Sequence, residues 1–226
     1  MLAAAALLSM PSAAHALGET VWITLNGGYG TYGMSDLNAE IDAFNTANAG
    51  TGFSFDHVDN GHLFGGALGF ETVGRWNIGL GWDRLNATTE AGDASGAMEY
   101  RFSANAWRLF AEYALRPIGQ SSIFLGGGVG IIQENGKFIV SQPGFAPAEY
   151  KLAGSDPMFE GYAGGNLWMT ERVALTTTVG YRYAKVKEVK IEGNVLIMSN
   201  GEAMSLDFSG PSVRVGIKLA AKPAGF

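Results

Sequence analysis

The strongest constraint in this sequence is an alternation of apolar with small or polar residues, in segments of about ten residues. In the segment from Trp107 to Arg116, apolar side chains take every second position, while Arg108 and Glu112 share the other parity. Because successive side chains of a β-strand point to opposite faces, this period of two predicts strands with one apolar face and one polar face.

Eight such segments follow one another, and the second and sixth alternate less cleanly. They span residues 21–32, 62–70, 77–85, 107–116, 123–131, 159–170, 173–183 and 212–219. Glycine, which supplies 33 of the 226 residues, is frequent on the small and polar parity and is too small to cover an exterior. We therefore expect the apolar faces to point outward against lipid and the small and charged residues to fill the interior. The outward positions we single out are Leu80, Trp107, Leu109, Val179, Val215 and Ile217.

Short and long connections alternate between these segments. The short ones span residues 71–76, 117–122 and 170–172, and the long, polar ones span 35–61, 86–98, 133–157 and 188–205. Short periplasmic turns and long external loops are typical of outer-membrane barrels. The pattern predicts an all-β, eight-stranded antiparallel up-and-down transmembrane barrel, integral in the outer membrane of a Gram-negative cell, with both termini in the periplasm.

Composition favours a membrane protein over a soluble sandwich or a soluble ligand-binding barrel, which could also alternate. Only 16% of the residues are charged, against about 25% in a typical soluble domain. The net charge of −6 offers no footprint for nucleic acid. The absence of cysteine excludes disulfides, a thiol nucleophile and cysteine-ligated metal.

The N-terminal residues resemble a secretory signal peptide. An apolar run from Leu2 to Leu8 precedes Ala14-His15-Ala16, which fits a small-residue cleavage site. We expect residues 1–16 to be the signal peptide, without its usual basic region, and residues 17–226 to form the barrel domain. An Ala-rich helix is the alternative.

Three stretches resemble a family of uncharacterised bacterial outer-membrane β-barrel-domain proteins. They are the first strand and loop over residues 27–45, the segment 179–186 and the segment 212–219. The chain after Leu17 is more remotely similar to the barrels of outer membrane proteins A, X and W. The resemblance implies an eight-stranded barrel and leaves the function open.

Several ionisable residues fall on the inward parity. They are Arg108, Glu112, Glu160, Arg182, Arg214 and Lys218, joined by Asp83 and Glu134. The interior of an eight-stranded barrel is just wide enough for side chains, and buried charges must be paired. We expect a salt-bridge network across the lumen that serves as filler. The alternative is a gate, which opens a narrow path when the pairs exchange partners.

The stretch Gly28-Tyr-Gly-Thr-Tyr-Gly33 matches the G-x-G-x-x-G dinucleotide pattern. That fingerprint requires a βαβ unit, and no later segment has a helical period, so we attribute these glycines to a barrel strand. The stretch that follows predicts a short helix with Leu37, Ile41 and Phe44 on one face, capped by Ser35 or Asp36. It could be a lid, but simple packing on neighbouring loops is the favoured interpretation.

Catalytic candidates are few. Outside the predicted leader the histidines are His57 and His62, beside Asp56 and Asp59. A lipid-modifying enzyme would need one of them close to a serine. We expect solvated polar groups there, no catalytic residue, no metal and no cofactor.

The sequence thus predicts a non-enzymatic outer-membrane barrel that displays external loops for envelope-structural or surface-interaction roles. A narrow channel for small solutes is the first alternative and a lipid-modifying enzyme the second. The expected partners are outer-membrane lipid and lipopolysaccharide, the barrel-assembly machinery during insertion, and an external ligand or surface of unknown nature.

Overall fold

The computed structural model describes residues 20–72, 74–93, 96–115 and 121–221. The predicted signal peptide lies outside the described residues. The elements in chain order are β1 (Thr20–Thr31), α2 (Ser35–Ala47), β2 (Asn60–Glu71), β3 (Trp76–Asp93), β4 (Gly96–Ala114), β5 (Ser121–Glu134), β6 (Lys137–Ser141), β7 (Ala148–Trp168), β8 (Val173–Val186), β9 (Lys190–Ile191), β10 (Asn194–Val195), β11 (Leu206–Asp207) and β12 (Gly210–Ala220).

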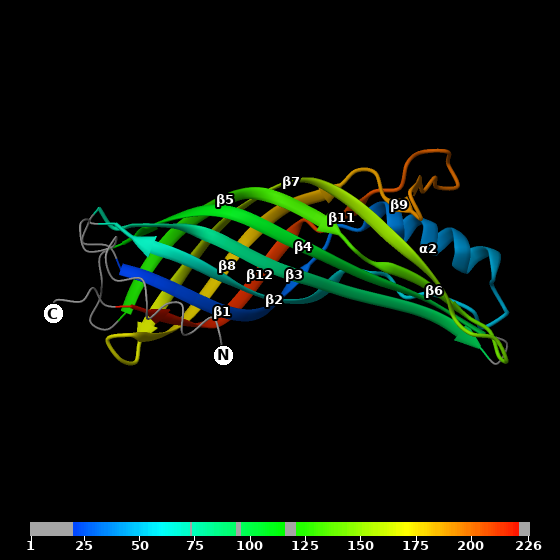
Figure 1. Cartoon of the computed structure of the whole chain (residues 1–226). Helices are drawn as coiled ribbons and strands as arrows, with labels where there is room; N and C mark the ends of the chain where they lie inside the picture. The colour runs from blue at the N-terminus through cyan, green and yellow to red at the C-terminus, as the bar shows by residue number, and fades with distance from the viewer. Residues whose placement is uncertain (1–19, 73, 94–95, 116–120, 222–226) are drawn as a thin grey trace.

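Eight of these strands form a closed antiparallel ring. The hydrogen-bonded order is β7, β5, β4, β3, β2, β1, β12 and β8, and β8 returns to pair with β7. The first and last strands pair in the register Trp22↔Ala220, which joins the two ends of the described chain. Figure 1 shows the strands wrapping obliquely around one axis. The predicted eight-stranded barrel is confirmed.

Glycine allows neighbouring strands to approach closely at the seam between β1 and β12. A Cβ atom built on Gly28 would lie 2.0 Å from the backbone oxygen of Val213, so no larger residue fits without moving the strand. Gly28 and Gly30 lie inside β1, which pairs antiparallel with β2 and β12. This arrangement supplies no βαβ unit, so the G-x-G-x-x-G match reflects strand packing.

The strands that flank two of the predicted short connections, β2 with β3 and β7 with β8, end and begin close to the predicted positions. The predicted connection 117–122 lies largely outside the described residues. Two of the predicted long connections are largely strands. Residues 86–98 continue β3 and β4 in register from Asn86↔Ser103 to Asp93↔Gly96. Within residues 133–157, β6 pairs with both β4 and β7. The strands β3, β4 and β7 therefore have 18, 19 and 21 residues, about twice the length that crosses a bilayer.

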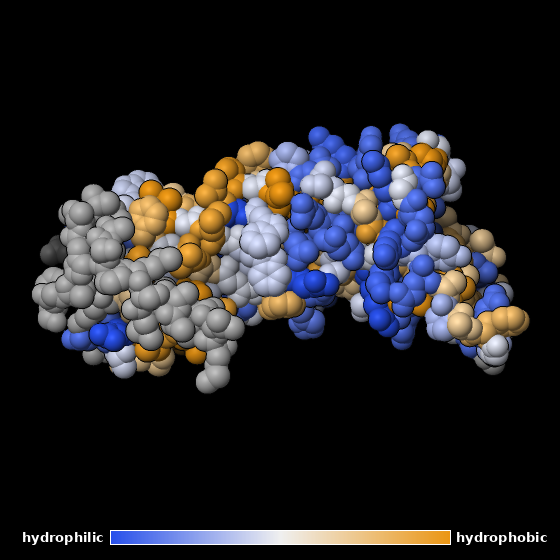
Figure 2. Space-filling view, in the orientation of Figure 1, coloured by the Kyte–Doolittle hydropathy of each residue, from blue (hydrophilic) through white to orange (hydrophobic). Residues whose placement is uncertain are grey.

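The outward surface of the ring carries a belt of exposed apolar side chains. One member from each ring strand illustrates it: Leu25, Leu68, Leu80, Leu109, Leu125, Leu167, Val179 and Val215. Exposed aromatic residues extend the belt at both ends, among them Tyr29 and Tyr181 at one end and Phe70 and Trp76 at the other. In Figure 2 apolar colour gathers over the barrel part of the molecule, while polar colour dominates the head and leaves apolar patches toward its far end.

Beyond the belt the two faces of the same strands exchange character. Leu85, Ala87 and Ala91 of β3 are buried inside, while Thr88 and Glu90 are exposed outside. This part, which we call the head, comprises α2, β6, β9–β11 and the portions of β3, β4 and β7 beyond the belt. It lies at the opposite end of the barrel from the short turns (Figure 1). Its apolar interior and polar exterior are those of a water-soluble domain.

The helix α2 packs on the rest of the head, as its periodicity predicts, with Leu37 and Ile41 buried in the apolar core. The predicted capping is wrong. Met34 occupies the N-cap position and makes no side-chain cap hydrogen bond. Asp36 instead accepts a hydrogen bond from the Ser205 hydroxyl, which ties the helix to the segment before β11. Within the described residues no helix is both long and apolar enough to span a bilayer.

Candidate functional site: the ionic lumen and the head

The lumen beneath the head is filled by ionisable side chains. All six sequence-predicted residues of the charge network, Arg108, Glu112, Glu160, Arg182, Arg214 and Lys218, are at most 8% exposed. Asp83, placed on the inward parity by the sequence, is fully buried. The structure brings only some of them into one network.

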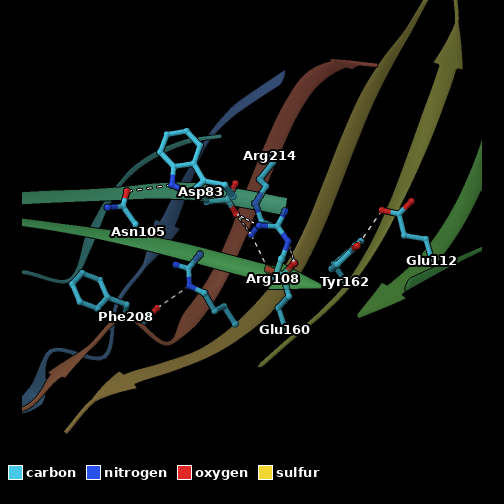
Figure 3. A network of polar contacts seen from close by, with 10 residues as sticks. Asp83, Asn105, Arg108, Glu112, Glu160, Tyr162, Phe208 and Arg214 are labelled. Carbon is cyan, nitrogen blue, oxygen red and sulfur yellow. Dashed lines mark hydrogen bonds and ion pairs between the residues drawn. The ribbon is translucent and has the colours of Figure 1, made fainter. Parts of the chain in front are cut away.

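Four of these residues form a closed quartet of alternating charge. Arg108 reaches Asp83 with Nη1 at 2.6 Å from Oδ2, and Glu160 with Nε at 2.6 Å from Oε1. Arg214 reaches the same two carboxylates through Nη2 at 2.9 Å each. Figure 3 shows Arg108, Arg214, Asp83 and Glu160 converging from different strands. Two positive and two negative charges thus neutralise one another across the lumen.

Glu112 and Lys218 lie apart from the quartet. The Tyr162 hydroxyl donates a hydrogen bond of 3.0 Å to Glu112 (Figure 3). The Lys218 ammonium lies 4.0 Å from the ring centroid of Trp22, as a cation–π contact. The Trp22 indole in turn donates to Asn77 at 3.1 Å. The sequence assigns Glu112 and Lys218 correctly to the interior, but it does not reveal these aromatic partners.

Arg182 lies at the junction of the lumen and the head and joins no ion pair among the described residues. Its Nε donates to the backbone oxygen of Phe208 at 3.3 Å. Its register partner across β7 and β8 is Glu160, whose carboxylate oxygens instead contact Arg108 and Arg214.

The outward residues lie as the strand parity predicts. The six positions singled out from the sequence, Leu80, Trp107, Leu109, Val179, Val215 and Ile217, are each between 48% and 60% exposed. Apolar side chains cannot remain against water over a whole belt without cost, so this surface is built to meet an apolar medium.

The head is held by a packed apolar core that lies directly above the quartet. Leu85, Ile132, Met158, Val186, Leu206 and Phe208 are at most 2% exposed. The core closes the barrel on this side, because these side chains come from β3, β5, β7, β8 and the segment before β12.

Glu134 is the one carboxyl buried within this core in the described part of the chain. It lies on β5 beyond Ile131, the last belt residue of that strand, and is 1% exposed. Its Oε1 accepts hydrogen bonds from the backbone N–H groups of Gly136 at 2.8 Å and Ser103 at 3.4 Å, while Oε2 has no partner. Burial raises the pKa of Glu134 from 4.5 to about 8.

An apolar cavity of about 170 Å³ opens in the head between α2, β4 and the segment after β10. Its walls include Ile41, Phe44, Phe55, Tyr100 and Met204, and Glu40 is its charged residue. Glu40 accepts hydrogen bonds from the backbone and hydroxyl of Ser199, so the helix and the distant loop are joined here. Among the residues that the structure describes, no cluster of His, Asp and Glu has the geometry to hold a metal ion.

The two histidines of the enzymatic alternative are separated. The exposed His57 in the loop after α2 contacts Asp42, with Nε2 at 2.8 Å from Oδ1, and this hydrogen bond raises the pKa of the imidazole. His62 lies on β2, edge-on to the ring of Tyr29. None of the hydrogen bonds in the described ranges joins a serine to either histidine.

An eight-stranded antiparallel ring with an apolar outer belt and an ionic interior is the architecture of transmembrane β-barrels. No family model and no curated protein matches this sequence. Solved structures of similar outline include Neisserial surface protein A, at 10% identity and a TM-score of 0.46, covering 89% of this chain and 96% of that one. OprG from Pseudomonas aeruginosa has 11% identity and a TM-score of 0.47, covering 91% and 96%. The outer membrane protease OmpT from Escherichia coli has 8% identity and a TM-score of 0.45, covering 90% and 96%. At this distance the likenesses say nothing about activity.

Proposed function

We propose that this protein is an integral outer-membrane barrel whose membrane part is a closed anchor and whose working part is the packed external head. The observation that carries the proposal is the reversal of sidedness along β3, β4 and β7. The same strands present apolar side chains outward in the belt and inward in the head. Such strands suit a chain that crosses a bilayer and then continues as a rigid domain in water.

The lumen favours an anchor over a channel. The quartet crosses it with ion pairs of 2.6–2.9 Å. The cavity on the turn side of the quartet has a volume of about 50 Å³, room for only a few water molecules. A conducting path would have to break a buried quartet and also displace the apolar core above it, and breaking one buried pair costs about 3–5 kcal/mol.

In this proposal the head is an interaction module that faces the outside of the cell, with the short turns and the described ends of β1 and β12 in the periplasm. The head presents exposed apolar side chains at its tips, including Phe145 at 75% and Ile197 at 55% exposed. Phe145 lies between β6 and β7, and Ile197 lies after β10. Loops held on a rigid support suit contact with an envelope component or a foreign surface.

Two measurements test this function. One is the single-channel conductance of the purified protein in planar bilayers, and the other is proteolysis of intact cells that carry the protein. We expect no ohmic single-channel steps, because the lumen is closed by both the quartet and the head. We expect protease added to intact cells to cut at the tips, near Phe145, and to leave the belt-spanning strands intact. Regular conductance steps would contradict the closed anchor if they persist in a variant whose head is locked by a cross-link. Protection of the tips from protease in intact cells would contradict the proposed orientation.

A further inference from the structure

The cavity of about 170 Å³ in the head has aromatic walls, and we call it the aromatic cavity. The rings of Phe44, Phe55 and Tyr100 line it. The ring centroid of Phe55 lies 5.1 Å from that of Phe44 and 5.5 Å from that of Tyr100. Neighbouring rings are tilted by 60° and 55°, so the three do not form a flat stack. The cavity therefore offers several aromatic surfaces to one occupant.

The aromatic cavity is open at the surface of the head and closed at its base. Glu40, Phe44 and Tyr100 are half-buried, whereas Ile41 is 3% exposed. A cavity of about 150 Å³ lined by apolar side chains is large enough to bind benzene. The aromatic cavity thus has room for a compact group of about that size, which can enter from the outside.

Glu40 gives the cavity a negative charge. Among the described residues that line it, Glu40 alone is charged at neutral pH, and none of the ion pairs in the described part of the chain includes this residue. Its Oε1 accepts both hydrogen bonds from Ser199, which leaves Oε2 available. Burial and, to a smaller extent, the charge of Glu40 raise the pKa of Tyr100. The field of the carboxylate therefore reaches the aromatic wall.

These features together favour a cation whose charge is covered by methyl groups. The face of an aromatic ring attracts positive charge, and aromatic cages are a recurring site for quaternary ammonium groups. A primary ammonium would lose hydrogen bonds to water in a cavity whose walls are largely apolar, and this loss costs free energy. A quaternary ammonium has no N–H group to satisfy, and Glu40 supplies the opposite charge.

We propose that the aromatic cavity binds a quaternary ammonium group of the choline type, with its methyl groups against Phe44, Phe55 and Tyr100 and its charge toward Glu40. This inference rests on the proposed function, since it gives the external head a class of ligand. Free choline and the phosphocholine group of lipids and surfaces carry the same cation, so the experiment includes both sources.

Calorimetric titration of the full chain tests the site, in a detergent that has no choline head group. The two probes are choline and the alcohol in which a tert-butyl group replaces the trimethylammonium group. The second probe has the same shape and no charge. We expect choline to bind saturably and the neutral probe to bind at least about tenfold more weakly, because it lacks the charge that the rings and Glu40 attract.

Three variants locate the binding. Glu40→Gln keeps an oxygen that accepts from Ser199 and removes the charge, so we expect choline to bind about tenfold more weakly and the neutral probe to bind as before. Unchanged binding of the neutral probe shows that the cavity is intact. Phe44→Leu keeps an apolar wall without a ring and should weaken choline binding several-fold. Asp42→Asn removes an exposed carboxylate of the same helix that does not line the cavity, and should bind choline as the wild type does.

Three results would overturn the proposal: no saturable binding of choline, equal affinities for choline and the neutral probe, or an unchanged choline affinity in Glu40→Gln. Phosphocholine, titrated in parallel, distinguishes the sources. An affinity at least equal to that of choline supports a phosphocholine-bearing surface, and a lower affinity supports a free quaternary ammonium solute. The closed anchor is tested separately by conductance and by proteolysis of intact cells, so a failure of choline binding leaves it standing.

Discussion

Arg214 and Asp83 are joined by a 2.9 Å ion pair that crosses the barrel, since β1 and β2 lie between their strands in the ring. The same Asp83 oxygen accepts from Arg108 on β4. Hydrogen bonds between paired strands set only the register of those two strands. An ion pair across the lumen also restrains the distance between opposite sides of the ring. The quartet therefore acts as a brace across the interior.

Replacing one member of the brace should destabilise the barrel strongly. Asp83→Asn leaves Arg108 and Arg214 with an uncompensated positive charge in a buried site, and we expect a loss of about 3–5 kcal/mol. Urea unfolding in detergent, followed by the shift of the folded band on an unboiled gel, measures it. Glu149→Gln removes a carboxylate from the exposed pair with Lys137, and it should change stability little. Equal effects of the two variants would show that the quartet does not brace the barrel.

The belt predicts a position-dependent cost for a charge. Leu80 lies on β3 opposite Leu109 of β4 and is 57% exposed. Leu80→Arg should cost about 2–4 kcal/mol for folding into lipid vesicles, because Leu80 lies between Ile78 and Trp82 in the outward row of β3. Ser155→Arg, on the outward face of β7 in the head, serves as the control and should fold as the wild type does. A tolerated Leu80→Arg would contradict the lipid-facing assignment.

Glu134 predicts a pH dependence of stability. Its pKa is about 8 in the folded protein and 4.5 in its ordinary state, so the folded state binds more protons than the unfolded state between these values. The contribution of Glu134 to the free energy of unfolding is therefore most favourable below pH 4.5 and falls as the pH rises to about 8. The difference between the two pKa values corresponds to a loss of at most about 5 kcal/mol in the free energy of unfolding.

The variant Glu134→Gln isolates this effect, because the amide oxygen can still accept from Gly136 and Ser103. The free energies of unfolding of the wild type and the variant are compared at about pH 5, pH 7 and pH 9, which bracket the raised pKa of Glu134. We expect the free energy of unfolding of the variant to increase relative to that of the wild type as the pH rises. A constant difference between the two proteins would show that Glu134 is not buried in a neutral form.

We expect the core of the head to be destabilised by mutation without unfolding of the barrel. Leu206 is completely buried above the lumen, and Leu206→Ala removes core volume worth about 2–5 kcal/mol. We expect limited proteolysis to become faster within α2 and the segment after β10, while the ring keeps its resistance to SDS before boiling. If the ring lost that resistance together with the head, the two parts would fold as one cooperative unit.

The ring and its sidedness were accessible from the sequence because they depend only on parity. Arg108, Glu160 and Arg214 lie on the parity opposite to the outward apolar residues of their strands, and this places them inside whatever the register. Which charges meet depends on the shear of the closed ring, which no single strand reveals. The sequence therefore predicted one network, whereas the structure divides it into the quartet, the Glu112–Tyr162 contact and the solitary Arg182.

The head was not predicted, because the inward face of its β3 portion carries small residues in place of large apolar ones. Between Leu85 and Met98 the inward positions of β3 hold Ala87, Thr89 and Ala91, which read as a loop when judged by hydrophobicity alone. Ala87 and Ala91 nevertheless belong to the same buried apolar cluster as Phe55, and the Thr89 hydroxyl donates a hydrogen bond to the backbone oxygen of Asp56. Tertiary contacts of this kind cannot be read from one strand alone. The alternation was present, but with its faces exchanged relative to the belt.

The outward apolar belt can be measured directly, because the chain contains no cysteine that would compete with an introduced one. Single cysteines at Val179 on the belt, Thr178 facing the lumen and Glu90 outside the head carry a spin label, in protein reconstituted in lipid vesicles. With apolar side chains facing lipid, we expect the label at Val179 to collide freely with oxygen and to be shielded from a water-soluble nickel complex, while the label at Glu90 shows the reverse. A Val179 label that is open to the nickel complex, or shielded from both reagents, would contradict the lipid-facing belt.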